Sequence, residues 1–324
     1  MKYLVTGGAG FVGSHLCESL LRKGEEVIAL DNLSTGNFSN IQGLLSNPKF
    51  SFQQGSVLDK SLLSELCQGV DGIFHLAAAV GVKYVMENLI SSIETNVKGT
   101  ENVLESAYKN GNIKVLLTSS SEVYGKSLKK HFHEEDDLII GPPHKYRWSY
   151  ACSKALDEFL ALGYYREKNL PVIIVRLFNV CGPRQTGRYG MVIPRLVSQA
   201  LKGEPLTIYG DGKQLRSFLH VRDAVEGMIA LMEERKAVGE IFNLGNPRGI
   251  TIEELAYKIK EITGSSSPLQ YIPYEEVYGP GFEDLRYRVP DIRKAKELVG
   301  FNPHHQLEDI LREVIDYFKK ENRP

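Results

Sequence analysis

The stretch Thr6-Gly7-Gly8-Ala9-Gly10-Phe11-Val12-Gly13 decides the fold, because it joins a short apolar run to an amphipathic pattern. The run before it, residues 3–5, predicts a buried strand, and residues 14–23 after it predict a helix. Three glycines at the spacing GxxGxxG allow, in order, a tight turn, close approach of the backbone to a pyrophosphate, and close packing of the helix on the strand: Gly7, Gly10 and Gly13. The stretch therefore predicts a phosphate-binding turn at the amino end of a helix.

Outward from this turn, short apolar runs alternate with helical patterns. Further strands are expected at residues 27–30, 50–53, 72–76, 114–118 and 172–177. These runs are continuously apolar, as strands buried on both faces are. We therefore predict an α/β fold, with a Rossmann doubly wound parallel sheet in residues 1–180. The chain is expected to come back to this sheet at about 218–245 and complete it. Residues 181–324 otherwise predict a smaller α+β substrate-binding domain.

Composition excludes several classes of protein. The 324 residues include 39 Lys+Arg and 40 Asp+Glu, a net charge of -1, which argues against a partner that is nucleic acid or an anionic membrane. Apolar residues at 42% and charged residues at 24% argue against disorder. Four scattered cysteines form neither a disulfide framework nor a CxxC motif. With no apolar run of about 20 residues and no signal-like start, we expect a cytoplasmic protein.

A carboxylate at the end of the second strand points to the cofactor. Asp31 lies about twenty residues after the glycines, where an acid binds a ribose diol and repels a 2′-phosphate. This position favours NAD over NADP, with Asn32 beside it; the alternative is a capped turn. After the third strand, Asp59 is expected to accept a hydrogen bond from adenine, with Val57 or Leu58 against the ring. Its alternative role is a helix N-cap.

A phenol and an ammonium group four residues apart suggest the chemistry. Tyr150 and Lys154 share one face of a predicted helix, and a nearby cation favours the phenolate, so Tyr150 is expected to act as a base. Lys154 is also expected to hold the nicotinamide ribose. The strand that ends in Thr118-Ser119-Ser120-Ser121-Glu122 supplies hydroxyl groups at the carboxyl edge of the sheet, where such folds bind ligands.

Together these motifs resemble an extended short-chain dehydrogenase/reductase of the nucleotide-sugar epimerase/dehydratase/decarboxylase group, nearly end to end. The matching segments are TGGAGFVGSH at 6–15, DNLSTG at 31–36, HLAA at 75–78, TSSSEVYG at 118–125, YACSK at 150–154, RLFNVCGPRQ at 176–185, YGDGKQLRSFLHVRD at 209–223 and FNLGNP at 242–247.

The resemblance implies roles for individual residues. It implies that Ser120 is the hydroxyl that acts with Tyr150 and Lys154. It also implies that Asn179 and Arg216 contact the diphosphate or the nucleotide of the sugar donor, which is expected to be a UDP-sugar. A further group is expected to line the NAD site: Phe11, Val12, Leu76, Ala77 and Ala78. Arg188, in the Gly187–Gly190 segment, is expected to cover the nucleotide, unless the segment is only a flexible connection. The resemblance also implies a homodimer, although the apolar stripe that contains Leu156 and Phe159 fits an intramolecular core equally well.

Two sets of residues disagree about the fate of the sugar after oxidation at C4. The loop at 75–84, with Lys83 and Tyr84, resembles that of 4-epimerases. In contrast, Ser121-Glu122, Arg147 and Arg288 resemble decarboxylases, and by that resemblance Arg288 acts at a substrate carboxylate. Two guanidinium groups suit a uronate, but binding its carboxylate tightly would oppose its loss. Glu122 is expected to distort or repel a uronate or to act as a base at C5, unless its carboxylate only bonds backbone amides.

We therefore expect an NAD-dependent nucleotide-sugar 4-epimerase acting on a UDP-hexose or UDP-glucuronate through a 4-keto intermediate. The alternative is a UDP-glucuronate decarboxylase. A 4,6-dehydratase is disfavoured because Ser121 stands where an aspartate is usual, and a non-catalytic NAD-binding scaffold is disfavoured because Tyr150 and Lys154 are both present. The segment HFHEEDD at 131–137 resembles a metal site in composition only, so we predict a solvated loop and no metal.

Overall fold

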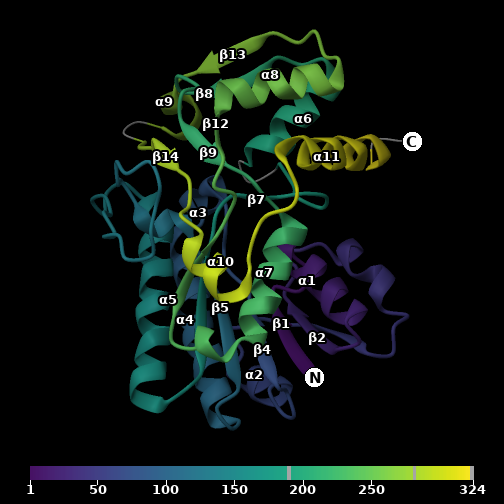
Figure 1. Cartoon of the computed structure of the whole chain (residues 1–324), viewed down its shortest axis with the longest axis vertical. Coiled ribbons are helices and arrows are strands. Elements are labelled where there is room, and N and C mark those ends of the chain that lie inside the picture. Colours follow the sequence, from purple (N-terminus) through teal and green to yellow (C-terminus); the bar gives the residue numbers. More distant parts are fainter. Residues whose placement is uncertain (188–190, 280–281, 322–324) are drawn as a thin grey trace.

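The centre of the molecule is a parallel β-sheet of seven strands, shown in the computed structural model of Figure 1, which describes residues 1–187, 191–279 and 282–321. In spatial order the strands are β3 (Phe50–Gln54), β2 (Glu26–Asp31), β1 (Lys2–Thr6), β4 (Gly72–His75), β5 (Lys114–Ser120), β6 (Val172–Leu177) and β11 (Ile241–Leu244). Every neighbouring pair is parallel, and the order reverses between β1 and β4. This is the predicted Rossmann topology, in which ligands bind at the carboxyl edge near the reversal.

Helices cover both faces of this sheet. One face packs against α1 (Phe11–Arg22), α7 (Val221–Glu233) and α10 (Arg293–Val299). The other packs against α2 (Lys60–Leu66), α4 (Leu89–Lys109) and α5 (Trp148–Lys168), and the short α3 (Val82–Glu87) precedes α4. Each face has its own buried apolar cluster, because the strands are apolar on both sides.

A smaller region lies above the carboxyl edge of the sheet in Figure 1. Its helices are α6 (Val192–Lys202), α8 (Ile252–Thr263), α9 (Tyr274–Tyr278) and α11 (Leu307–Glu321). Its short strands form three small sheets: β7 (Val180–Cys181) with β10 (Leu219–His220); β8 (Leu206–Tyr209) with β13 (Leu269–Ile272); and β9 (Leu215–Ser217) with β12 (Gly249–Thr251) and β14 (Tyr287–Arg288). A separate buried cluster between α6, α8 and α11 holds this region together.

The chain crosses between the two regions more than once. After β6 it enters the smaller region, returns through α7 and β11 to the main sheet, and leaves it again. The predicted return at about 218–245 therefore contains both α7 and β11. The division into domains at residue 180 stays a prediction.

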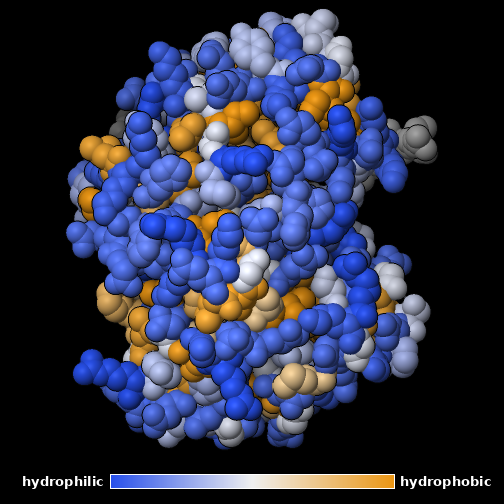
Figure 2. All heavy atoms as spheres, in the orientation of Figure 1, coloured by the Kyte–Doolittle hydropathy of each residue, from blue (hydrophilic) through white to orange (hydrophobic). Residues whose placement is uncertain are grey.

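The surface seen in Figure 2 is mainly hydrophilic, with hydrophobic residues in small groups. None of the helices in the described ranges is both long enough and apolar enough to cross a membrane. The cysteines are all free thiols, and only Cys152 is exposed, as expected for a chain without a disulfide framework.

Candidate active site

The glycine turn after β1 has the geometry that the sequence predicts. Gly7 has φ +73°, a left-handed conformation that favours glycine. A Cβ atom at Gly13 would lie 2.1 Å from the carbonyl oxygen of Gly7, so no larger residue fits there. Gly10 is the N-cap of α1 and has no side chain to block the backbone N–H groups that follow it. The turn can therefore accommodate a pyrophosphate against the helix N-terminus.

Asp31 closes this turn from the end of β2. Its carboxylate accepts hydrogen bonds from the backbone N–H of Ala9 at 3.0 Å and of Leu33 at 2.8 Å. Burial nevertheless raises the pKa of Asp31 above its ordinary value. A Cβ atom at Gly36 would lie 2.8 Å from this carboxylate, so only glycine fits at position 36. Asp31 and Asn32 both line the cleft, as a ribose-binding pair must.

The expected adenine contacts divide into two groups. Val57 lines the cleft, whereas Leu58 and Asp59 are not among its lining residues. The Asp59 carboxylate instead caps α2, accepting from the N–H of Leu62 at 3.0 Å, which is the alternative role that the sequence offered. The cleft is also lined by the predicted cofactor residues Phe11, Val12, Leu76, Ala77 and Ala78.

One continuous cavity of about 480 Å³ extends from the glycine turn into the smaller region. This volume falls within the range of small-molecule sites. Its walls include residues of both regions, from Gly7 on one side to Arg288 on the other. A dinucleotide at the sheet and a second ligand beneath the smaller region would therefore meet inside the same cleft.

Ser120 and Tyr150 meet where the two halves of this cleft join. Ser120 ends β5, Tyr150 lies in the first turn of α5, and their hydroxyl groups are hydrogen-bonded. Lys154 is buried one turn further along α5 and donates to Asp157 at 2.8 Å. Burial, reinforced by the charge of Glu122, raises the pKa of Tyr150 above its ordinary value, while the bond to Ser120 opposes the shift. Ser120 and Tyr150 therefore meet in the cleft, whereas Lys154, bonded to Asp157, is not among the residues that line it.

Glu122 lies between two guanidinium groups, rather than against backbone amides. Its carboxylate accepts from Arg147 Nη2 at 2.9 Å and from Arg288 Nη1 at 2.6 Å. Burial would raise the pKa of Glu122, but the two arginines outweigh it and hold that pKa below its usual value. Arg288 also donates to the Ser121 hydroxyl at 2.8 and 3.1 Å. The decarboxylase-like residues of the sequence therefore form one connected network.

The other residues expected to bind the substrate are only partly brought together. Arg216 and Asn179 line the cleft; Arg216 donates to Asp284 at 2.8 Å, and Asn179 donates to the carbonyl of Ser217 at 2.8 Å. Tyr84 also lines the cleft. Lys83 is not among the lining residues: it is exposed and pairs with Glu87. Arg188 lies outside the described residues.

Sequence reasoning missed several polar and aromatic residues of the cleft: Gln185, Arg195, Gln214, Tyr274, Tyr278, Phe282 and Asp284. They come from the smaller region. Arg195 lies on α6 and two tyrosines lie on the short α9, while the others lie in turns and loops that give no clear periodicity. Asp284 does have a local signal, because it lies in the YGPGFED segment close to Arg288. The partner that it provides for Arg216 depends on the packing of β9 against β14 and was not predictable.

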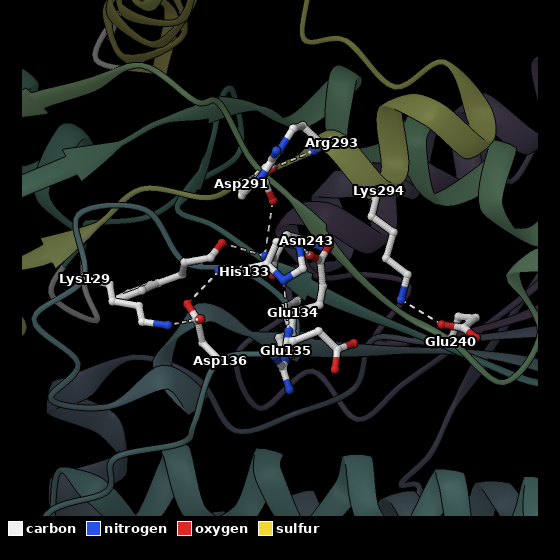
Figure 3. Close-up of polar contacts among 12 residues, drawn as sticks. Lys129, His133, Glu134, Glu135, Asp136, Glu240, Asn243, Asp291, Arg293 and Lys294 are labelled. Carbon is white, nitrogen blue, oxygen red and sulfur yellow. Dashed lines mark hydrogen bonds and ion pairs between the residues drawn. The ribbon is translucent and has the colours of Figure 1, made fainter.

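The acidic and histidine-rich segment at 131–137 is a structural loop, as Figure 3 shows. The buried Glu134 accepts from the backbone N–H of Asn243 at 2.8 Å, which ties the loop to β11. Asp136 accepts from the backbone N–H of His133 at 2.8 Å and pairs with Lys129. These contacts use the carboxylates to fix the loop.

In the part of the chain that is described, the one set of side chains spaced like metal ligands is His220, His305 and Glu313. However, His220 Nδ1 accepts from the N–H of Arg222 at 3.1 Å, so the neutral ring has its proton on Nε2, which faces Glu313 at 3.2 Å. The two rings are also stacked, at 18° and 4.1 Å. One metal ion cannot lie in the planes of two stacked rings, so this arrangement does not suit a metal.

Comparisons with known proteins agree with this geometry. The model of the NAD dependent epimerase/dehydratase family matches residues 3–245. The UDP-N-acetyl-alpha-D-glucosaminuronate decarboxylase of Bacillus cytotoxicus is 46% identical over 320 residues, which cover 98% of both chains. UDP-glucuronic acid decarboxylase 1 of Arabidopsis thaliana is 40% identical over 98% of this chain and 70% of its own length.

Among solved structures, the UDP-glucuronic acid 4-epimerase from Bacillus cereus, in complex with UDP-glucuronic acid and NAD, has a TM-score of 0.89 at 32% identity. The match covers 99% of this chain and all of that one. The glycine turn and Asp31 fit the same cofactor. The chain is therefore an NAD-dependent enzyme and belongs to the NAD dependent epimerase/dehydratase family.

Proposed function

We propose that the enzyme decarboxylates a UDP-linked uronic acid, UDP-glucuronate or its 2-acetamido analogue, through oxidation at C4. The sequence alone favoured 4-epimerisation, with decarboxylation as the alternative. The names of the relatives at 46% and 40% identity support the alternative, whereas the structural likeness to a UDP-glucuronate 4-epimerase supports the same substrate with another outcome.

The observation on which this proposal depends is Arg147. Its side chain is buried and lines the cleft beside Tyr150, and its Nε and Nη1 have no hydrogen-bond partner among the described residues. A buried donor without a partner is costly, so a ligand oxygen is its expected partner. With Arg288 nearby, the site suits an anionic group such as the C6 carboxylate of a uronate.

The charge of Glu122 favours loss of that carboxylate over its retention. Arg147, Arg288 and Glu122 together have a net charge of +1, enough to admit one carboxylate without binding it strongly. A strongly stabilised substrate carboxylate would raise the barrier to its own loss. An enzyme that keeps the carboxylate has no need for an acid that competes for both arginines.

The remaining residues account for the oxidation. Tyr150, hydrogen-bonded to Ser120, accepts the proton of the C4 hydroxyl, and Lys154 holds the ribose next to the reacting ring. A bound NAD would supply the hydride acceptor for C4 and, at the end, the hydride donor. A C4 ketone lies β to the carboxylate, so the C5–C6 bonding pair can move into the C4 carbonyl as carbon dioxide leaves. The enolate then takes a proton at C5 from solvent, which restores the C4 ketone. The proton held by Tyr150 goes back to the C4 oxygen when this ketone is reduced.

We also propose a homodimer through α4 and α5. Leu156 and Phe159 on α5 are 50% and 70% exposed, so they do not belong to the intramolecular core. Ile90 and Ile93 at the start of α4 are exposed as well, and α4 packs beside α5. A pair of such helices from a second copy would cover these side chains.

The proposal is tested by supplying the enzyme with NAD and, separately, UDP-glucuronate, its 2-acetamido analogue and UDP-glucose. Decarboxylation predicts products lighter by about 44 Da from the uronates and none from UDP-glucose. A product of unchanged mass with inverted C4 would show the epimerase instead.

A further inference from the structure

A carboxylate follows Tyr150 and Lys154 on the same face of α5. Asp157 lies seven residues after Tyr150 and three after Lys154, spacings that place all three side chains on one stripe of a helix. The carboxylate accepts from Lys154 Nζ at 2.8 Å, and the two side chains are 0% and 2% exposed. The chemistry described above gives Asp157 no role.

The surroundings of Asp157 make it a costly residue to bury. Burial raises its pKa, while the ammonium of Lys154 and the nearby Thr100 hydroxyl of α4 oppose the shift. Its Oδ1 has no hydrogen-bond partner among the described residues. A neutral leucine or alanine would fill the space between α4 and α5 at lower cost. The charge is therefore best explained by what it does to Lys154.

Within the described residues, the bond to Asp157 is the one ion pair that Lys154 makes. His75 of β4 also faces Lys154, but it is held between the hydroxyls of Thr6 at 2.7 Å and Thr100 at 3.1 Å. Burial, with a smaller contribution from Lys154, lowers the pKa of His75 to about 3, so this ring is neutral. Asp157 is thus the group that compensates the ammonium.

Several charges act on Tyr150 from the elements around it. Glu122 and Asp157 disfavour the phenolate, whereas the Ser120 hydroxyl and Arg288 favour it. Lys154 adds a positive charge one helical turn away. Because Asp157 is bonded to that ammonium, the field of Lys154 at the phenol is partly cancelled.

We propose that Asp157 is a positioning residue: it fixes the Lys154 ammonium on α5 and offsets its charge, and so sets the pH range in which Tyr150 accepts the substrate proton. The inference rests on the proposed role of Tyr150 in C4 oxidation. Asp157 is about 10 Å from Tyr150 along the helix, and one charge at that distance in protein shifts a pKa by about one pH unit.

The test is Asp157→Asn, which keeps the size and removes the charge. The acidic limb of the kcat profile is expected to move about one pH unit lower, because the uncompensated ammonium favours the phenolate. Asp157→Glu, which restores the charge, should return the limb towards that of the unmodified enzyme. Glu167→Gln, which removes an exposed charge from the same helix, should not move it. An unmoved limb, or one moved to higher pH, overturns the proposal, and a loss equal at every pH shows a structural role.

A second measurement does not depend on turnover. In the NAD-loaded protein with ¹³Cζ-labelled tyrosine, NMR follows ionisation of Tyr150, and Tyr150→Phe identifies its signal. The signal should titrate at lower pH in Asp157→Asn, or in Asp157→Ser if the first variant does not fold; no change overturns the inference. If instead the titration moves as expected while no uronate is consumed, the proposed function fails and the inference about Asp157 stands.

Discussion

Arg288 donates to Glu122 across 2.6 Å, although 166 residues separate them in the sequence. Arg288 belongs to β14 of the smaller region, and Glu122 follows β5 of the main sheet. The contact places an arginine of the C-terminal segment next to Tyr150. The active site is therefore complete only when both regions have packed together.

Glu122→Gln removes the acid that competes with the substrate for the two arginines. Under the proposed function, the arginines should then bind the uronate more strongly, so KM should fall and kcat should fall about 10- to 100-fold. Steady-state kinetics checks this, with the exposed Glu135→Gln of a nearby loop as the control. A kcat equal to that of the unmodified enzyme would show that Glu122 does not act on the substrate.

Tyr150→Phe removes the hydroxyl that, under the proposed function, exchanges the C4 proton. Turnover should fall by about 10²- to 10⁴-fold, because general base catalysis is lost while the ring still packs. NAD binding and thermal stability should persist. The comparison variant is Tyr146→Phe, an exposed residue just before α5, which should behave like the unmodified enzyme. Activity near the normal level in Tyr150→Phe would rule out the proposed base.

Asp31 should exclude NADP. Its carboxylate is the predicted partner of the ribose, and repulsion of a 2′-phosphate about 5 Å away predicts a preference for NAD of about 100-fold or more. Asp31→Ser should weaken NAD binding and reduce this preference, as calorimetric titration with both cofactors would show. Asp71→Ser, at the opposite edge of the sheet, is the control. Equal affinity of the unmodified enzyme for both cofactors contradicts the assignment.

Lowering the pH should protonate Glu283 and weaken its contacts, and so reduce the stability of the fold. Burial opposes ionisation, but together the hydrogen bonds from Lys126, Lys145 and Trp148 outweigh it and lower the pKa of Glu283 to about 2. A lowered carboxylate pKa stabilises the fold fully above the unfolded value of about 4.5, and the gain is lost as the pH falls towards 2. The partly exposed group should contribute no more than about 1 kcal/mol.

Thermal melts between pH 7 and pH 3 test this. At neutral pH Glu283→Gln should melt below the unmodified enzyme, and the difference should shrink as the pH falls. A difference independent of pH would mean that the packing of the side chain, and not its charge, is responsible.

Phe159→Glu tests the proposed homodimer. A charge in place of this exposed ring should be costly at an apolar interface and should shift the protein towards monomer in analytical ultracentrifugation. Tyr257→Glu, another exposed aromatic on α8, should leave the assembly unchanged. A protein that is monomeric before substitution would refute the dimer itself.

Local patterns explain which parts the sequence could predict. The glycine turn, the six strands predicted in residues 1–180 and the placing of Tyr150 and Lys154 one turn apart on α5 each depend on residues close in sequence, so spacing was sufficient. The short strands β9, β12 and β14 were missed because two or three residues show no periodicity. The network of Glu122 with Arg147 was not predictable from spacing, since it requires α5 to pack against the end of β5.

The same limit applies to single carboxylates. Asp59 was open to an adenine-binding role and to a capping role, and the structure shows the cap, which depends only on the helix that follows. For Glu122 the sequence offered backbone amides as the ordinary partner, whereas two distant arginines provide it. Asp157 has a clear helical spacing from Lys154, but many surface acids share that spacing, and only its burial distinguishes it.

The central claim is that the substrate loses its carboxylate, and carbon labelling tests it most directly. The NAD-loaded enzyme would be given UDP-glucuronate and its 2-acetamido analogue, each labelled with ¹³C at C6, in deuterated water, and followed by NMR. The account predicts that the label leaves as carbon dioxide and that deuterium enters at C5 of the product. Retention of the label in a sugar with inverted C4 and no deuterium at C5 would contradict it.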